Sequence, residues 1–239
     1  MNLKNLTKIK GDASFRKFFR KKDSDRSSVI VYAKKEKLKN LIIYDSINKI
    51  LIKNKILAPN LLLENYNKHY LEIQDFGNDT IFKILKKSRT NQISYFKKII
   101  TLLNKIQSIK SKKIKNFKKN TYIIPKYDKK ILIDEANLFC DWYAKKHLNN
   151  LKQDKFTKSF KKILKNLTNN LKLKNNFFVH RDFHVSNLML INNQIGLIDS
   201  QDALIGNRAY DLASLIDDVR LKTSKAFKDK VYYFYVKKI

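Results

Sequence analysis

The feature of this sequence that most restricts its fold is a change of hydrophobic pattern near Gly77. Before it, the segments ASFRKFFR (13–20) and SVIVYAK (28–34) are short, aromatic or β-branched, and separated by a charged turn. Such segments predict strands within residues 11–34. From Ile81 onward, apolar residues recur mostly at three- and four-residue steps, as they do in helices. The pattern therefore predicts an α+β chain with a sheet-containing lobe over residues 1–77 and a mainly helical lobe over 78–239.

The N-terminal lobe is predicted to hold one helix and a second pair of strands. Residues 38–57 carry apolar side chains at helical spacing, and Pro59 follows as a stop signal. Residues 61–64 and 70–73 are apolar segments on either side of a polar turn, so they predict a hairpin.

The C-terminal lobe has three segments with clear helical periodicity, at 93–109, 132–148 and 160–171. The lysine-rich connection 110–126 predicts a solvated loop. In the middle segment, Cys140 is expected to be a small buried hydrophobe rather than a nucleophile. Trp142 and Tyr143 are expected to pack in the core, with stacking on a sugar ring as the alternative.

The net charge of +31 suggests a nucleic acid or an anionic surface as a partner. Two observations argue against this partner. Only seven of the 52 basic residues are arginine, the side chain best suited to forked phosphate contacts, and the lysines are spread along most of the chain. Lys, Asn and Ile are abundant together, which is typical of an AT-rich genome. We therefore favour compositional bias and keep a polyanion partner as the alternative.

The chain has the character of a cytoplasmic protein. No segment approaches the roughly 18 uncharged apolar residues of a membrane span, and the N-terminal residues lack the apolar core of a signal peptide. The single cysteine cannot form an internal disulfide, which suits a reducing compartment.

The stretch HRDFHVSNLMLINNQIGLIDSQD (180–202) concentrates the polar chemistry of the sequence. Its apolar segments 188–191 and 195–198 flank Asn192-Asn193, residues that tolerate left-handed turn conformations, so they predict a hairpin. In that register position 187 lies opposite 198, and 199 lies opposite 186. Asn187 and Asp199 therefore meet at the open end of the hairpin, and Asp182 enters beside them.

An amide oxygen and a carboxylate in this arrangement can coordinate Mg²⁺. Together with a second carboxylate that can act as a base, they form the parts of a phosphoryl-transfer site. A buried hairpin with ordinary turn polarity explains the fixed spacing poorly. Zinc binding by His180 and His184 is a further alternative, although the surrounding sequence predicts a loop and lacks a matching third ligand.

The spacing His180-x-Asp182-x-x-x-x-Asn187 followed by Ile198-Asp199 resembles the motifs of the aminoglycoside phosphotransferase/choline kinase superfamily, relatives of the protein kinases. The sequence is most similar to the bacterial anomeric kinases of N-acetylmuramate and N-acetylglucosamine. Further islands carry this resemblance, namely GDASFR (11–16), YDKKILIDEANLFCDWY (127–143) and IDSQDALIGNRAYDLASLIDD (198–218). The resemblance implies a bilobal protein-kinase-like fold whose C-terminal lobe carries a catalytic hairpin.

The resemblance also implies roles for individual residues. Asp182 would be the catalytic base, and Asn187 and Asp199 the Mg²⁺ ligands. His180 would support the catalytic loop, and Asp211 would brace it, with a helix N-terminal cap as the equally plausible alternative for Asp211.

In the N-terminal lobe the resemblance implies a site for ATP. Ser14 would lie in the turn over the phosphates, and Lys34 would pair with the phosphates, although the adjacent Lys35 leaves this assignment open. The adenine would lie against the connection from Gln74 to Gly77.

The sequence departs from the resembled pattern in three ways. It has no glycine-rich phosphate loop. Ser200 follows the metal-binding Asp where an aromatic residue is usual, so a packing contact is expected to be lost. The chain ends at Ile239, where similar proteins usually continue through further helices, which suggests a compact or truncated variant.

We therefore expect an ATP- and Mg²⁺-dependent kinase acting on an amino sugar. Substrate-binding residues and the oligomeric state cannot be assigned from the sequence. An aminoglycoside or choline acceptor is a second possibility, and a weakly active kinase-like protein that binds a polyanion or a partner is a third.

Overall fold

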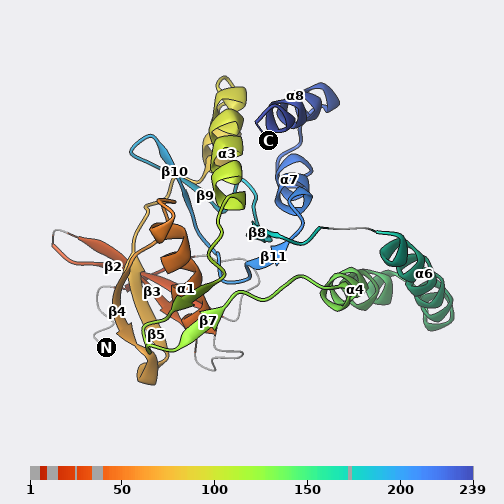
Figure 1. The fold of residues 1–239 in the computed structure, drawn as a ribbon, viewed down its shortest axis with the longest axis horizontal. Coiled ribbons are helices and arrows are strands. Elements are labelled where there is room, and N and C mark those ends of the chain that lie inside the picture. Colours follow the sequence, from red (N-terminus) through yellow and green to blue (C-terminus); the bar gives the residue numbers. More distant parts are fainter. Residues whose placement is uncertain (1–5, 10–15, 25, 34–39, 172–173, 239) are drawn as a thin grey trace.

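A computed structural model describes the chain except for residues 1–5, 10–15, 25, 34–39, 172–173 and 239. The N-terminal part is built on a five-stranded antiparallel sheet with the order β1-β2-β3-β5-β4 (Figure 1). Its strands are β1 (Leu6–Ile9), β2 (Lys17–Lys22), β3 (Ser27–Tyr32), β4 (Leu61–Asn65) and β5 (Tyr70–Gln74). A 3₁₀ turn (Tyr66–Lys68) joins β4 to β5.

One face of this sheet packs against α1 (Asn40–Lys53). Val29 and Val31 of β3 lie opposite Ile73 and Leu71 of β5, so the four side chains share one face, as the two-residue period of a strand requires. They form a small apolar core with Leu41 and Tyr44 of α1, among others. This core holds the helix in a fixed position beside the site described below.

The C-terminal part is mainly helical, with short two-stranded sheets between the helices. Its helices are α2 (Ile81–Lys87), α3 (Gln92–Gln107), α4 (Lys129–Leu138), a π-helix (Phe139–Ala144), α5 (Lys145–His147), α6 (Asn150–Asn170), α7 (Ala209–Ile216) and α8 (Lys225–Val236). Its strands are β6 (Lys113–Lys115), β7 (Thr121–Ile123), β8 (Phe177–Val179), β9 (Leu188–Ile191), β10 (Gln194–Leu197) and β11 (Leu204–Gly206).

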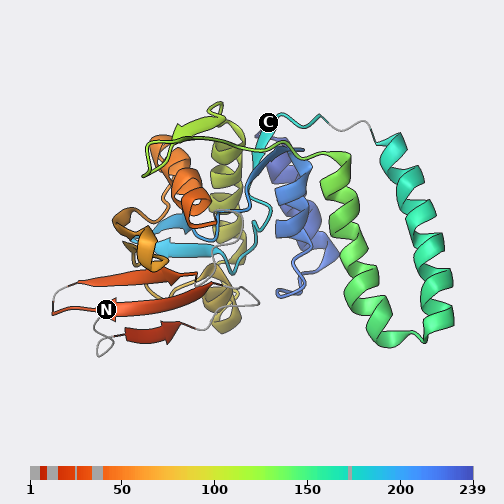
Figure 2. The same cartoon turned by 90° about the horizontal axis from the view of Figure 1, so that it is seen from below.

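The largest core surrounds α3, whose buried residues Phe96, Ile99, Ile100, Leu103 and Ile106 recur at helical spacing. By contrast, α4 and α6 form an arm that stands away from the rest of the molecule (Figures 1 and 2). Each of these two helices is amphipathic, but Thr168 is the one residue that is buried in the two of them.

Several expectations about local structure were wrong. The sequence did not predict β1, which pairs with β2. The helix predicted over 38–57 ends at Lys53 among the described residues, because Lys55 adopts a left-handed conformation (φ 57°). The expected solvated loop at 110–126 instead contains the hairpin β6–β7, in which Ile114 is buried.

The expectations for the segment 132–148 had mixed outcomes. The segment is helical, with a π-helical turn at its centre, and Cys140 is buried as predicted. The prediction that Trp142 and Tyr143 pack in the core was wrong, since they are 76% and 56% exposed. A helical period identifies an apolar face, but it does not say whether another element covers that face.

Candidate active site

One buried carboxylate, that of Asp211, holds the loop between β8 and β9 (180–187). Asp211 of α7 accepts hydrogen bonds from the backbone N–H groups of His180 (2.8 Å) and Arg181 (3.0 Å). Burial raises the pKa of Asp211 to about 7, while the two N–H donors favour its charged form. The N-cap of α7 is Arg208, so Asp211 contacts the loop and does not cap the helix.

His180 connects this loop to the end of the hairpin β9–β10. Its Nε2 lies 3.1 Å from the carbonyl oxygen of Ile198, so the neutral ring donates a hydrogen bond there. The ring is fully buried, and burial lowers the pKa of His180 to about 4. The histidine is therefore uncharged at neutral pH and links the two segments that carry the candidate catalytic residues.

The hairpin has the register that the sequence predicted. Leu188 pairs with Leu197, and the backbone N–H of Ile198 donates to the carbonyl of Asn187 (3.1 Å). Both Asn192 and Asn193 have positive φ angles, as the two-residue turn requires. Asn187 and Asp199 consequently flank the open end of the hairpin, next to the loop that carries Asp182.

Asp182, Asn187 and Asp199 are brought close together. The amide nitrogen of Asn187 donates to the backbone carbonyl of Asp182 (3.0 Å), which leaves the amide oxygen outside that bond. Burial, and next the negative charge of Asp199, raise the pKa of Asp182 above its ordinary value. A half-buried carboxylate with a raised pKa beside a second carboxylate has the environment of a general base.

Arg16, a residue not predicted from the sequence, contacts the same group. Its guanidinium donates to the carboxylate of Asp199 across 2.9 Å, and Arg16 itself is 8% exposed. Asp199 has a left-handed backbone conformation (φ 62°). Two signals in the sequence could have identified Arg16, namely the scarcity of arginine and its place at the end of the GDASFR segment.

The donor atoms at the hairpin end suit a hard divalent cation. The Asn187 amide oxygen and the Asp199 carboxylate are both oxygen ligands, the type that Mg²⁺ prefers. Over the part of the chain that the structure describes, no three His, Cys, Asp or Glu side chains are grouped closely enough to hold a metal ion. His184 Nε2 instead lies 3.4 Å from the amide nitrogen of Asn187.

Ser200, the position where an aromatic residue was expected, is fully buried. Its hydroxyl donates to the side-chain oxygen of Asn48 on α1 (2.6 Å), and the amide nitrogen of Asn48 donates to the carbonyl of Pro59 (3.2 Å). The residue after Asp199 is thus tied to the N-terminal helix by a polar contact.

The residues predicted for the nucleotide are only partly described. Ser14 and Lys34 lie outside the described residues. Gln74 accepts a hydrogen bond from Asn60 (2.9 Å), and Gly77 has φ 81°, a conformation that favours glycine. Arg20 of β2 donates to the carbonyl of Gly77 (2.8 Å) and holds the segment after β5 against the sheet.

A second cluster joins the arm to the catalytic loop. Glu135 of α4 accepts hydrogen bonds from Arg181 and from the hydroxyl groups of Tyr127 and Tyr210. The exposed Trp142 and Tyr143 belong to the π-helix that follows α4 on this arm. Asp202 is also exposed, and its carboxylate accepts from Gln201 (2.6 Å).

Comparison with known proteins identifies the family to which this fold and this group of residues belong. Residues 5–232 match the phosphotransferase enzyme family APH, and the chain belongs to this family. The structure is similar to the gentamicin complex of APH(2″)-IIa, with a TM-score of 0.69 at 17% identity, covering 98% of this chain and 77% of that one. It is also similar to ADP-bound APH(2″)-Ib, with a TM-score of 0.66 at 18% identity, covering 99% and 78%.

The curated proteins that the chain matches include three named N-acetylmuramate/N-acetylglucosamine kinase. The one from Neisseria meningitidis is 26% identical over 223 residues, 93% of this chain and 64% of the relative. The one from Pseudomonas aeruginosa is 28% identical over 213 residues, 89% of this chain and 60% of the relative. The chain therefore spans less than two thirds of the length of these relatives. In the described part of the chain, no helix is both long and apolar enough to cross a membrane.

Proposed function

We propose that the protein is an ATP- and Mg²⁺-dependent kinase that transfers the γ-phosphoryl group of ATP to a hydroxyl of a small molecule. The observation that supports this most directly is the meeting of Asp182, Asn187 and Asp199 at one end of a hairpin. The buried Asp211 and His180 hold the backbone around them. Phosphoryl transfer depends mainly on positioning and on charge stabilisation, so it requires oxygen ligands that are held rigidly.

In this proposal Asp182 orients the acceptor hydroxyl and takes its proton while the hydroxyl oxygen bonds to the γ-phosphorus and the bond to ADP breaks. Asn187 and Asp199 would hold Mg²⁺, which when bound neutralises the phosphate oxygens. Ser14 and Lys34 would contact the phosphates, and the segment from Gln74 to Gly77 would contact the adenine.

The acceptor is proposed to be an amino sugar phosphorylated at its anomeric hydroxyl. The names of the curated relatives support this choice. The charge of the chain adds a weaker argument, because a sugar with a carboxylate, such as N-acetylmuramate, suits a basic protein. A cationic aminoglycoside would need an acidic pocket, and the sequence has only 21 acidic residues against 52 basic ones.

The test is to incubate the purified protein with ATP, Mg²⁺ and a panel of acceptors, and to measure ADP release. We expect turnover with N-acetylmuramate or N-acetylglucosamine. Turnover only with choline or an aminoglycoside would overturn the sugar proposal and retain the kinase. Absence of turnover with every acceptor would contradict the kinase activity of this chain.

The role of Asp182 is tested with the variant Asp182→Asn, in which the side chain keeps its size and loses its basicity. We expect turnover to fall by a factor of about 10²–10⁴, while the affinity for ATP changes little. Asp229→Asn, on the exposed surface of α8, is the matched control and should leave turnover unchanged. Equal turnover in both variants would show that Asp182 is not the base.

A further inference from the structure

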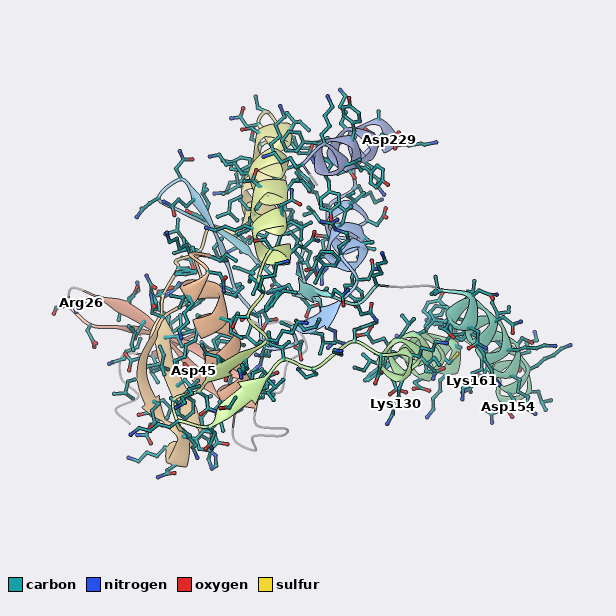
Figure 3. The ribbon with its side chains drawn as sticks, viewed as in Figure 1. Arg26, Asp45, Lys130, Asp154, Lys161 and Asp229 are labelled. Atoms are coloured by element: carbon teal, nitrogen blue, oxygen red, sulfur yellow. The ribbon has the colours of Figure 1, made fainter. Side chains whose placement is uncertain are left out.

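A large cavity in the described part of the chain lies outside the candidate active site. It has a volume of about 790 Å³, is open to solvent on one side, and is bounded by α1, by the strands β4 and β5, and by the hairpin β6–β7. None of Asp182, Asn187 and Asp199 lines it. Figure 3 labels Asp45, one of its lining residues, on the side of α1 that the hairpin passes. The cavity thus lies between α1 and the hairpin β6–β7, which was predicted to be a loop.

The walls of the cavity combine an apolar surface with positive charge. Ile52, Leu61, Ile73 and Ile114 are among its apolar lining residues. A ligand with an apolar body would displace water from this surface with a gain in free energy that grows with the area covered.

The charged groups around the cavity are four lysines and one acid. The lysines are Lys49, Lys53, Lys113 and Lys115. The acid is Asp45, whose carboxylate forms an ion pair with Lys49 (2.8 Å) and accepts a hydrogen bond from the backbone N–H of Phe117 (3.0 Å). No hydrogen bond or ion pair with a described residue engages the ammonium groups of the other three lysines.

We propose that this cavity is a binding site for a small organic anion, with an apolar body against the isoleucine and leucine side chains and an acidic group among the lysines. Three lysines without an ion-pair partner among the described residues line this concave surface, and their positive charges favour an anion there. The apolar side chains of the walls and the few charged ones together have the composition that is usual for ligand-binding sites.

The cavity is connected to the candidate active site through α1. Tyr44 and Asn48 both line the cavity, and Asn48 accepts the hydrogen bond of Ser200, which follows Asp199. A ligand that contacts Asn48 therefore meets the same side chain that holds the end of the hairpin. Binding in the cavity is expected to change the affinity of the hairpin end for Mg²⁺, and by thermodynamic reciprocity the metal changes the affinity for the anion.

The experiment uses 8-anilinonaphthalene-1-sulfonate, an aromatic sulfonate whose fluorescence rises on binding. It is titrated into the protein without nucleotide or metal, so that the result does not depend on the proposed kinase activity. The test variant is Lys53→Glu/Lys113→Glu. The control is Lys130→Glu/Lys158→Glu on the arm, which changes the net charge equally (Figure 3 labels Lys130). We expect the affinity to fall about tenfold or more in the test variant and to stay within about twofold in the control.

A third variant fills the cavity without changing its charge. Thr121→Trp, at an exposed lining position on β7, should also weaken binding, and thermal unfolding of each variant checks that it is folded. Equal affinity in the cavity variants and the unaltered protein would overturn the proposal. Loss of affinity only in the arm variant would assign the dye to the exposed aromatic residues of the arm instead. The link through α1 is refuted if saturating dye leaves the Mg²⁺ affinity unchanged.

Discussion

At the scale of single residues, the ion pair between Arg16 and Asp199 bears most directly on the metal. The guanidinium lies on the carboxylate that is proposed to bind Mg²⁺, and the Asp199 side chain is 35% exposed. A cation that binds to this carboxylate has to compete with the arginine. Because Asp199 is partly open to solvent, the pair contributes only about 1 kcal/mol or less to stability.

We expect the variant Arg16→Ala to bind Mg²⁺ more tightly in the absence of nucleotide. Removal of a positive charge about 3 Å from the carboxylate removes both the competition and a repulsion, worth on the order of 1 kcal/mol or a factor of about five in affinity. The measurement is a metal titration followed by thermal unfolding or calorimetry. Arg26→Ala is the control, since Arg26 is exposed at the tip of a turn (Figure 3). A weaker affinity in Arg16→Ala would mean that the arginine helps to hold the metal.

His180 and Asp211 respond to pH in opposite directions. The folded state lowers the pKa of His180 to about 4, so the unfolded chain takes up the proton first as the pH falls. Its contribution to stability is complete above pH 6.5 and is lost as the pH falls toward 4. Burial raises the pKa of Asp211 to about 7, so its contribution is present at low pH and is lost as the pH rises through 7.

The histidine contribution can be isolated with His180→Gln, whose amide can still donate to the carbonyl of Ile198. Between pH 7.5 and pH 5 the free energy of unfolding should fall by about 2 kcal/mol more in the unaltered protein than in the variant. Asp211 is present in both proteins, so its opposite effect cancels in the difference. Urea unfolding at the two pH values measures it. Parallel pH dependence in the two proteins would contradict a buried neutral histidine.

At the scale of secondary-structure elements, the contact between Ser200 and Asn48 joins the hairpin end to α1. Both side chains are buried, and they lie 152 residues apart in the sequence. The connection crosses from the helical part of the chain to the sheet-containing part. A change in the position of α1 would therefore move Ser200, the residue next to Asp199.

The variant Ser200→Ala should destabilise the protein by about 1–3 kcal/mol, because it leaves the buried oxygen of Asn48 without its donor. Ser46→Ala is a matched control in the same helix. Ser46 is equally buried, but its hydroxyl donates to the carbonyl of Ile42 one turn earlier, so its loss should cost about 0.5 kcal/mol or less. Chemical unfolding of both variants gives the comparison. An equal loss of unfolding free energy in the two variants would mean that the contact between Ser200 and Asn48 stabilises the protein no more than a hydrogen bond within the helix.

The predictable parts of this fold are those that depend on local pattern. The register of β9–β10 followed from the turn residues Asn192-Asn193, and the paired strands β4 and β5 from two apolar segments around a polar turn. The strands β1 and β6 were missed because lysine and threonine interrupt their apolar residues, and three or four residues give too short a pattern.

The unpredicted features of the site are contacts between distant residues. The pairs Arg16–Asp199 and Ser200–Asn48 are 183 and 152 residues apart, and no periodicity reports them. The catalytic candidates were accessible because a fixed spacing around one hairpin brings them together. The kinase-like fold followed from the motif resemblance, and the comparisons confirm it.

At the scale of the whole molecule, the positive charge has to be reconciled with a small-molecule site. Figure 3 shows nitrogen-tipped side chains on the sheet, on α3, on α8 and on the arm, without confinement to one of them. Most of these lysines are exposed. A dispersed surface of this kind attracts any polyanion through long-range electrostatics, which dissolved salt screens within about 8–10 Å.

We therefore expect binding to a short DNA duplex to be weak, independent of base sequence and steeply dependent on salt. The affinity should fall by a factor of about 10³ or more between 50 and 200 mM NaCl, as it does for proteins that contact several phosphates without reading bases. Fluorescence anisotropy with two unrelated duplexes measures both properties. Binding that persists at 200 mM NaCl and prefers one duplex would require a built nucleic-acid site. That result would favour the polyanion-binding alternative. The alternative would gain further support if no sugar gave turnover and if Asp182→Asn bound DNA as tightly as the unaltered protein. Loss of binding at 200 mM in both proteins would instead assign the charge to composition, because a surface that holds a polyanion only at low salt cannot discriminate among the polyanions of a cell.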